Sequence, residues 1–138
     1  MKNYVVFEEL SGKILRSGVA PEEMVPLQAG AGERWAITPD SVRDDTHYVS
    51  DVKLGLVSPR PSLTLAPSKT TVAADGVDAA VIDVPANAEV VVEMPWNEEL
   101  RTTVATPPLE LTFDRPGIYR VKVSAFPYRD AWVEIHAA

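Results

Sequence analysis

Apolar and polar residues alternate along most of the second half of the chain, and this pattern predicts short β-strands. Leu109, Leu111 and Phe113 share one face of an extended segment, whereas the intervening residues of that segment are polar. The same alternation recurs in "AAVIDV", "EVVVEM", "YRVKVS" and "AWVEIHA", and shorter extended runs are "SLTLA", "TTVAA" and "LRTTVAT". Seven to eight strands separated by turns at roughly 8–12 residues predict a β-sandwich over residues 63–138.

Residues 1–58 show a less regular pattern. Extended runs on both sides of Ser11-Gly12 predict a β-hairpin, and "RWAIT", "THYVSD" and "LGLVSP" predict further short strands. Between them, Pro21 suits a first helical position, and the two glutamates after it complement the positive end of a helix. Pro26 limits this helix to about two turns, and Gly30 is its expected end. We therefore expect a small antiparallel β-meander with one short helix.

A pair of prolines separates the two patterns. Pro59 and Pro61 each remove a backbone donor and disfavour helix in the preceding residue. The sequence thus predicts a mainly β protein with an N-terminal domain of residues 1–58, a link of residues 59–62 and a C-terminal domain of residues 63–138.

The "RPGIY" segment interrupts the alternation and is expected to form a corner between two strands. Pro116 presets φ for the second position of a turn, and Gly117 supplies the positive φ that a type II turn needs at its third position. Tyr119 then enters the next strand with its ring inward. An inward tyrosine after a turn resembles the tyrosine corner, in which the hydroxyl bonds back to the preceding backbone. We interpret the segment as a structural corner, not a site of chemistry.

Composition narrows the classes of partner. The chain has 20 acidic and 13 basic residues and a net charge of −7, which disfavours binding to nucleic acid. No apolar run of about 18 residues occurs, so no membrane insertion is expected. There is no cysteine, which excludes disulfides and thiolate chemistry. The N-terminus has no signal-peptide pattern, so folding in a cytosol is expected.

Candidate chemistry is sparse. His47 follows Asp44 and Asp45, but no second histidine and no known ligand spacing accompanies them, so a solvated loop is the favoured interpretation. Asp75 and Asp78 are the place to look for calcium, although the pattern of oxygen ligands is thin. We expect no cofactor, no metal and no enzymatic activity.

Three aromatic residues near turns are the better candidates for binding. Trp96 lies beside the polar turn "NEE", Tyr128 follows Pro127, and Trp132 is expected to face outward. Exposed aromatic side chains are enriched at contact surfaces, so these residues could bind a protein or stack on a sugar. The alternative is partial burial at the ends of the predicted sandwich.

Residues 65–85, "LAPSKTTVAADGVDAAVIDVP", resemble the first half of a bacterial immunoglobulin-like (Ig-like) domain, a type found in invasin-like adhesins and many phage virion proteins. "FDRPGIYRVKV" is similar to the penultimate strands of that family. The resemblance covers about residues 62–138 and implies an Ig-like sandwich. It says little about function, because such domains spread as modules.

Residues 4–33, together with "HYV" and "VSPRP", resemble the leading segments of small proteins encoded among tailed-phage structural genes. This resemblance implies a virion component of the tail, baseplate or fibre region, assembled in the host cytoplasm. Its expected partners are other virion proteins in multiple copies, with a host surface glycan as a further candidate. The alternative function is a carbohydrate-binding or adhesive surface module.

Overall fold

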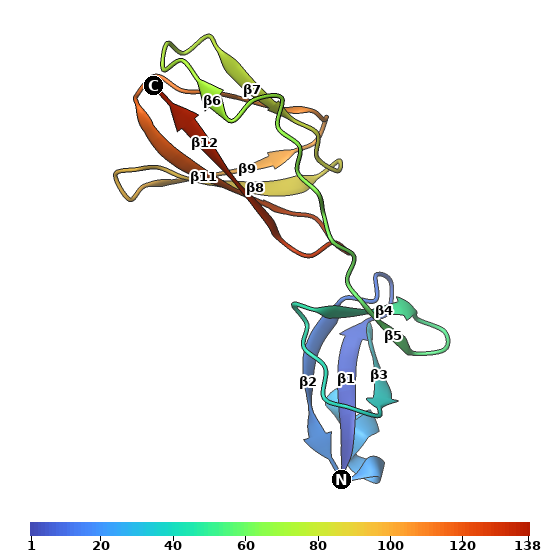
Figure 1. Ribbon diagram of the computed structural model, residues 1–138. Coiled ribbons are helices and arrows are strands. Elements are labelled where there is room, and N and C mark those ends of the chain that lie inside the picture. Colours follow the sequence, from blue (N-terminus) through green and yellow to red (C-terminus); the bar gives the residue numbers. More distant parts are fainter. The chain divides into compact units, whose positions relative to one another are not determined.

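The computed structural model describes residues 1–138 and is mainly β, as the alternation predicts, with 48% of residues in strands and 5% in one helix. The chain divides into two compact units, Met1–Pro61 and Ser62–Ala138 (Figure 1). Each unit has a buried apolar core of its own. No helix is long and apolar enough to cross a membrane.

The first unit contains two small antiparallel sheets. A three-stranded sheet has the order β2-β1-β3, and a two-stranded sheet pairs β4 with β5. The strands are β1 (Lys2–Glu8), β2 (Ile14–Ala20), β3 (Glu33–Thr38), β4 (His47–Asp51) and β5 (Leu56–Pro59). The predicted first hairpin is therefore confirmed.

Gly12 joins the two sheets of the first unit. Its φ of 80° is in the left-handed region, and an added Cβ would overlap the Val49 carbonyl oxygen. The Val49 amide donates to the Gly12 carbonyl at 2.8 Å. Phe7, Ile14 and Val49 are buried together, so this close approach of backbones lies next to the core of the unit.

The predicted helix is present, but it is a 3-10 helix, η1 (Glu22–Gln28). Pro21 precedes it instead of forming its first residue, and it ends before Ala29, not at Gly30. Pro26 lies inside η1 and has no amide to donate, which is consistent with a short helix that lacks regular α-helical bonding. Val25 is the buried residue of η1.

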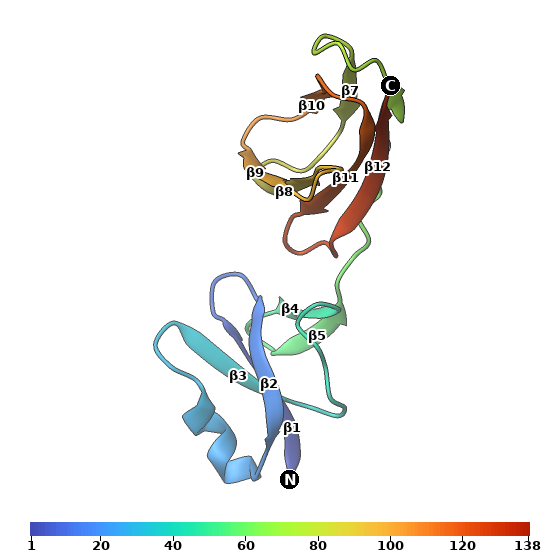
Figure 2. The same ribbon diagram turned by 90° about the vertical axis from the view of Figure 1, so that its left-hand side faces the viewer.

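The second unit contains a five-stranded sheet of order β6-β12-β11-β8-β9 and a two-stranded sheet of β10 and β7. Only the β6–β12 pair is parallel. The strands are β6 (Thr71–Val72), β7 (Ala79–Ile82), β8 (Ala88–Glu93), β9 (Glu99–Val104), β10 (Leu109–Thr112), β11 (Gly117–Ser124) and β12 (Ala131–Ala137). Figure 2 shows β7 and β10 apart from β8, β9, β11 and β12. Side chains from both sheets form one core, in which Ile82, Val121 and Ile135 are fully buried.

Two sequence-based expectations are wrong in this unit. Residues 62–66 form no strand, and the predicted strand over 70–74 is reduced to Thr71–Val72. Ser68 instead ties this stretch to β7: its amide donates to the Val81 carbonyl at 2.8 Å, and its hydroxyl accepts from the Val81 amide at 2.9 Å. Leu63 and Leu65 are partly buried against the core. Their apolar side chains therefore contribute to packing, although their backbone joins no β-sheet.

The predicted link of residues 59–62 also needs adjustment. Pro59 belongs to β5, where it lies opposite His47, and the Arg60 amide donates to the Thr46 carbonyl at 2.8 Å. Pro59 can occupy the end of this edge strand because it needs no ladder donor there. The first compact unit extends to Pro61.

Candidate functional site

The corner at the start of β11 is built around Tyr119. Its side chain is 3% exposed, and its hydroxyl donates to the Arg115 carbonyl at 2.7 Å. The Phe113 ring packs against it with 4.3 Å between ring centroids. Burial raises the pKa of the Tyr119 phenol, so the group remains a neutral donor. A hydroxyl bound to backbone four residues upstream is the arrangement that defines a tyrosine corner.

The backbone conformation of Gly117 is not the one that the sequence predicted. Its φ is 149°, and it is the first residue of β11, whereas the third position of a type II turn has φ near +80°. Glycine is needed here for another reason: an added Cβ would overlap Cγ of Pro95. Pro116 precedes the strand. The close contact with Pro95 cannot be predicted from "RPG" alone, because Pro95 is distant in sequence.

Trp96 is partly buried and packs against the core of the second unit. Its ring meets Tyr119 edge-on, with centroids 6.0 Å apart and an interplanar angle of 88°. The guanidinium carbon of Arg115 lies 4.5 Å from the Trp96 ring centroid. These contacts hold Trp96 as part of the corner, which favours the alternative of partial burial over an open contact surface.

Trp132 is placed differently. It lies on β12 opposite Lys122 of β11, and 46% of the residue is exposed. The guanidinium carbon of Arg120 is 4.5 Å from the ring centroid, and Lys122 Nζ is 5.6 Å from it. Arg120 is in turn paired with Glu93 at 3.7 Å, and Lys122 with Asp130 at 3.4 Å. The indole is thus held on the outer face of the sheet by two cations that are themselves anchored.

The three aromatic candidates do not form one site. Trp96 contacts Tyr119, whose side chain is in the core, whereas Trp132 is on the opposite, outer face of the same sheet. Tyr128 is partly exposed in the turn between β11 and β12, where its amide donates to the Ala125 carbonyl at 2.7 Å.

His47 and its neighbouring acids are not brought together. His47 begins β4, and its Nδ1 lies 2.8 Å from the Thr46 hydroxyl oxygen. Asp45 pairs with Arg43 at 2.7 Å. No group of three or more histidine, aspartate or glutamate side chains is arranged to hold a metal ion. His47 does line a groove of about 320 Å³, whose other lining residues are mostly apolar.

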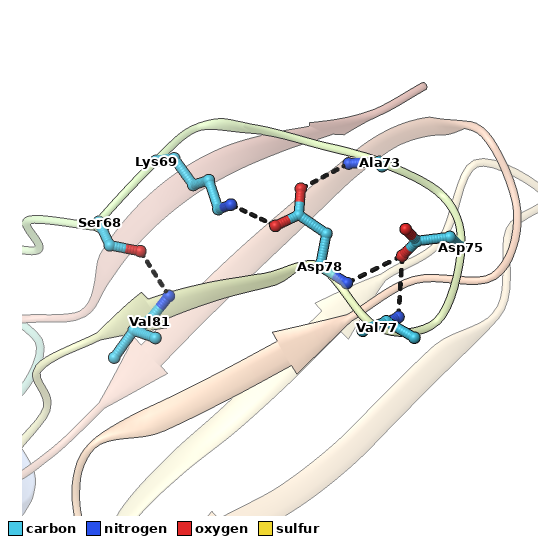
Figure 3. Close-up of polar contacts among 7 residues, drawn as sticks. All are labelled: Ser68, Lys69, Ala73, Asp75, Val77, Asp78 and Val81. Atoms are coloured by element: carbon cyan, nitrogen blue, oxygen red, sulfur yellow. Dashed lines mark hydrogen bonds and ion pairs between the residues drawn. The ribbon is translucent and has the colours of Figure 1, made fainter.

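Asp75 and Asp78 support the loop before β7 (Figure 3). One carboxylate oxygen of Asp75 accepts from the amides of Val77 and Asp78, at 2.9 and 2.8 Å. Asp78 forms an ion pair with Lys69 and accepts from the Ala73 amide at 2.9 Å. These partners lower the pKa of both carboxyl groups: mainly the two backbone amides at Asp75, and mainly Lys69 at Asp78. Both carboxylates therefore have structural partners within the loop.

The structure also shows an apolar surface that the sequence analysis did not single out. Four large side chains of the first unit are 37% to 72% exposed: Trp35, Ile37, Leu54 and Leu56. Trp35, Ile37 and Leu54 line one depression, and Ile37 and Leu56 line the groove that contains His47. We call these four residues the apolar patch. The alternation in "RWAIT" places Trp35 and Ile37 on one face, but only the fold shows that each of these residues stays more than a third exposed.

Comparison of the sequence with protein-family models and with curated proteins finds no match to either.

Proposed function

We propose that this chain is a non-enzymatic structural component of a tailed-phage virion, in the tail, baseplate or fibre region. In this proposal the first unit docks on the particle, and the second unit is an Ig-like β-sandwich presented by it. The observation that carries the proposal is the second unit: two sheets around one core, with a tyrosine corner beside the sequence that resembles an Ig-like domain.

The strand arrangement supports an Ig-like sandwich. The two-stranded sheet contributes Ile82 and Leu109 to the core, and the five-stranded sheet contributes Val90, Val121 and Ile135. β6 crosses to the larger sheet and pairs in parallel with β12. Antiparallel sheets that bury alternating residues against each other, with chain crossings between them, are typical of Ig-like domains.

The apolar patch supports docking by the first unit. Contiguous exposed apolar patches often mark interaction surfaces, and Trp35, Ile37 and Leu54 line one depression of this unit. A virion presents many copies of each component, so contacts that are individually weak can still hold by avidity. Docking through the apolar patch would bury Trp35, Ile37, Leu54 and Leu56 against a neighbouring virion protein.

The roles of the polar residues support a structural function. The carboxylates of Asp75 and Asp78 bind backbone amides and Lys69, and the Tyr119 hydroxyl binds a carbonyl. Each of these groups stabilises a loop or corner, and none is aimed at a shared reaction centre.

The test is to purify particles of the phage that carries the coding sequence, and to look for the chain by mass spectrometry and cryo-electron microscopy. We expect density for both units on the tail, baseplate or fibre. Leu54→Lys should reduce the number of copies per particle, whereas Leu10→Lys should not, because Leu10 is 99% exposed in the same unit but outside the apolar patch. Fully assembled particles without this chain would refute the proposal.

A second candidate function is a carbohydrate-binding or adhesive module, and the position of Trp132 favours it. An indole held on a sheet by Arg120 and Lys122 offers an exposed apolar surface with charged groups beside it, which suits stacking on a sugar ring. Glycan-array binding by the full chain should be lost in Trp132→Ala and kept in Val77→Ala, a substitution at another exposed apolar residue of the same unit. Binding that both variants retain would exclude this role for Trp132.

A further inference from the structure

β9 is an edge strand whose outer backbone faces no other strand of the chain. It ends the order β6-β12-β11-β8-β9 (Figure 2). The Met94 amide donates to the Glu98 carbonyl at 2.8 Å, and Val92 lies opposite Leu100 in the same ladder. In an antiparallel pair, successive residues direct their backbone groups to alternate sides. Glu98 and Leu100 therefore bond toward β8, and the amides and carbonyls of Glu99, Arg101 and Thr103 point outward.

Leu100 is incompletely covered, although it is on the core side of the sheet. It is 50% exposed, whereas Val92, its ladder partner, is 3% exposed. Leu100 and Leu111 of β10 line a mostly apolar cavity of about 110 Å³. The two-stranded sheet contains only β10 and β7, so no strand beyond β10 covers β9. A partner at this edge would gain both backbone hydrogen bonds and apolar contact.

The charges of β9 are complementary to a second copy of the same strand. Glu99 and Arg101 are on the outer face, two residues apart, and Arg101 Nη2 lies 3.1 Å from Glu99 Oε2. If two β9 strands run antiparallel with Leu100 opposite Leu100, then Glu99 of each copy lies opposite Arg101 of the other. We propose that the protein self-associates by this pairing of β9 with β9, about a two-fold axis at Leu100.

The charges select this register over its neighbours. Moving the axis by one residue in one direction places Glu99 opposite Glu99, and in the other direction it places Arg101 opposite Arg101. Like charges directly opposite each other destabilise a strand pair. The Leu100 register instead makes two Glu–Arg pairs and about four backbone hydrogen bonds, and it brings the two half-exposed leucines together. This pairing does not depend on the proposed virion function.

The first test is sedimentation equilibrium of the full chain up to about 1 mM, which would detect association worth about 4 kcal/mol. We expect the average mass to rise from 15.0 kDa toward twice that value. Arg101→Glu and Glu99→Arg should each raise the dissociation constant by about tenfold or more, because both create like-charge pairs. Lys2→Glu, with the same charge change as Arg101→Glu but on an exposed residue of the other unit, should not.

The register predicts two rescues that a merely structural effect of the substitutions would not produce. The double variant E99R/R101E restores opposite charges in both pairs and should associate like the unmodified chain. An equimolar mixture of the Glu99→Arg and Arg101→Glu proteins should also associate, because every cross-strand pair is then opposite in charge. A chain that remains monomeric at about 1 mM, or variants that neither rescue restores, would overturn the proposal.

The second test uses the absence of native cysteine. Leu100→Cys places two thiols directly opposite each other, within the range that a disulfide can span, so mild oxidation should give a covalent dimer. Thr102→Cys is the matched control on the same face of β9: its two copies would be four residues apart along the strand, about 13 Å, and should not cross-link. Cross-linking through position 102 but not 100 would overturn the register.

Discussion

Tyr119→Phe removes one hydroxyl from the corner and leaves the ring in place. That hydroxyl donates to the Arg115 carbonyl at 2.7 Å, and the ring is 3% exposed with Phe113 packed against it. Phenylalanine keeps the aromatic contacts, so the substitution isolates the hydrogen bond.

The expected cost is about 1 kcal/mol. A neutral intramolecular hydrogen bond contributes about 0.5–1.5 kcal/mol net, and an acceptor left without a partner adds more when it is buried. Arg115 is exposed, so water can reach its carbonyl and limit that penalty. For a unit of this size, about 1 kcal/mol corresponds to a decrease in Tm of roughly 4–8 °C.

The assay is thermal or urea unfolding of the full chain followed by amide NMR signals, which separates the two units. Signals of Val121 and Val123 should report the destabilisation, and those of Val5 and Phe7 should keep their midpoint. Tyr4→Phe, in β1 of the first unit, is the matched control and should leave the second unit unchanged. A free energy of unfolding of the second unit in Tyr119→Phe that lies within about 0.2 kcal/mol of the value for the unmodified chain would refute the role assigned to the hydroxyl.

Four further substitutions test the remaining assignments. Gly117→Ala should destabilise the second unit by at least about 1–3 kcal/mol in calorimetry, because it combines a φ of 149° with overlap of Pro95; a neutral effect would contradict that account. Asp78→Asn should lower stability at pH 7. The lowered pKa of Asp78 means that its contribution is present above about pH 4 and is lost as pH falls through the folded-state pKa, so urea midpoints of the variant should depend less on pH below about 4. Trp96→Ala should cost about 2 kcal/mol in chemical unfolding and Trp132→Ala under about 1 kcal/mol, since only the first ring packs against the core; equal losses would argue against the two placements.

Much of the secondary structure is predictable from local patterns. The alternation in "AAVIDV", "YRVKV" and "AWVEIHA" places Ile82, Val121 and Ile135 on the inner face, and all three are fully buried. This works because successive side chains of a strand point to opposite faces, so one apolar face identifies both the strand and its orientation. The Ser11-Gly12 turn likewise marked the first hairpin, because the local conformation there requires glycine.

Contacts between residues far apart in sequence decided the rest. Residues 62–66 have the composition of a strand but form none, since whether they join a ladder depends on the neighbouring backbone and not on their own side chains. Trp132 lies on the outer face, as the alternation of its strand predicts. For Trp96 the local pattern left burial open, and the contact of its ring with Tyr119, 23 residues away in sequence, decided it.

The sequence by itself determined that the chain is mainly β, that its two halves follow different patterns, and which side chains face inward, because these properties follow from a period of two residues and from the backbone limits of proline and glycine. Only the tertiary structure decided the order of the strands, the contact of Gly117 with Pro95, and the exposure of β9 and the apolar patch. Each of these depends on which distant segments meet, and pairing between distant strands leaves no local signal in the sequence.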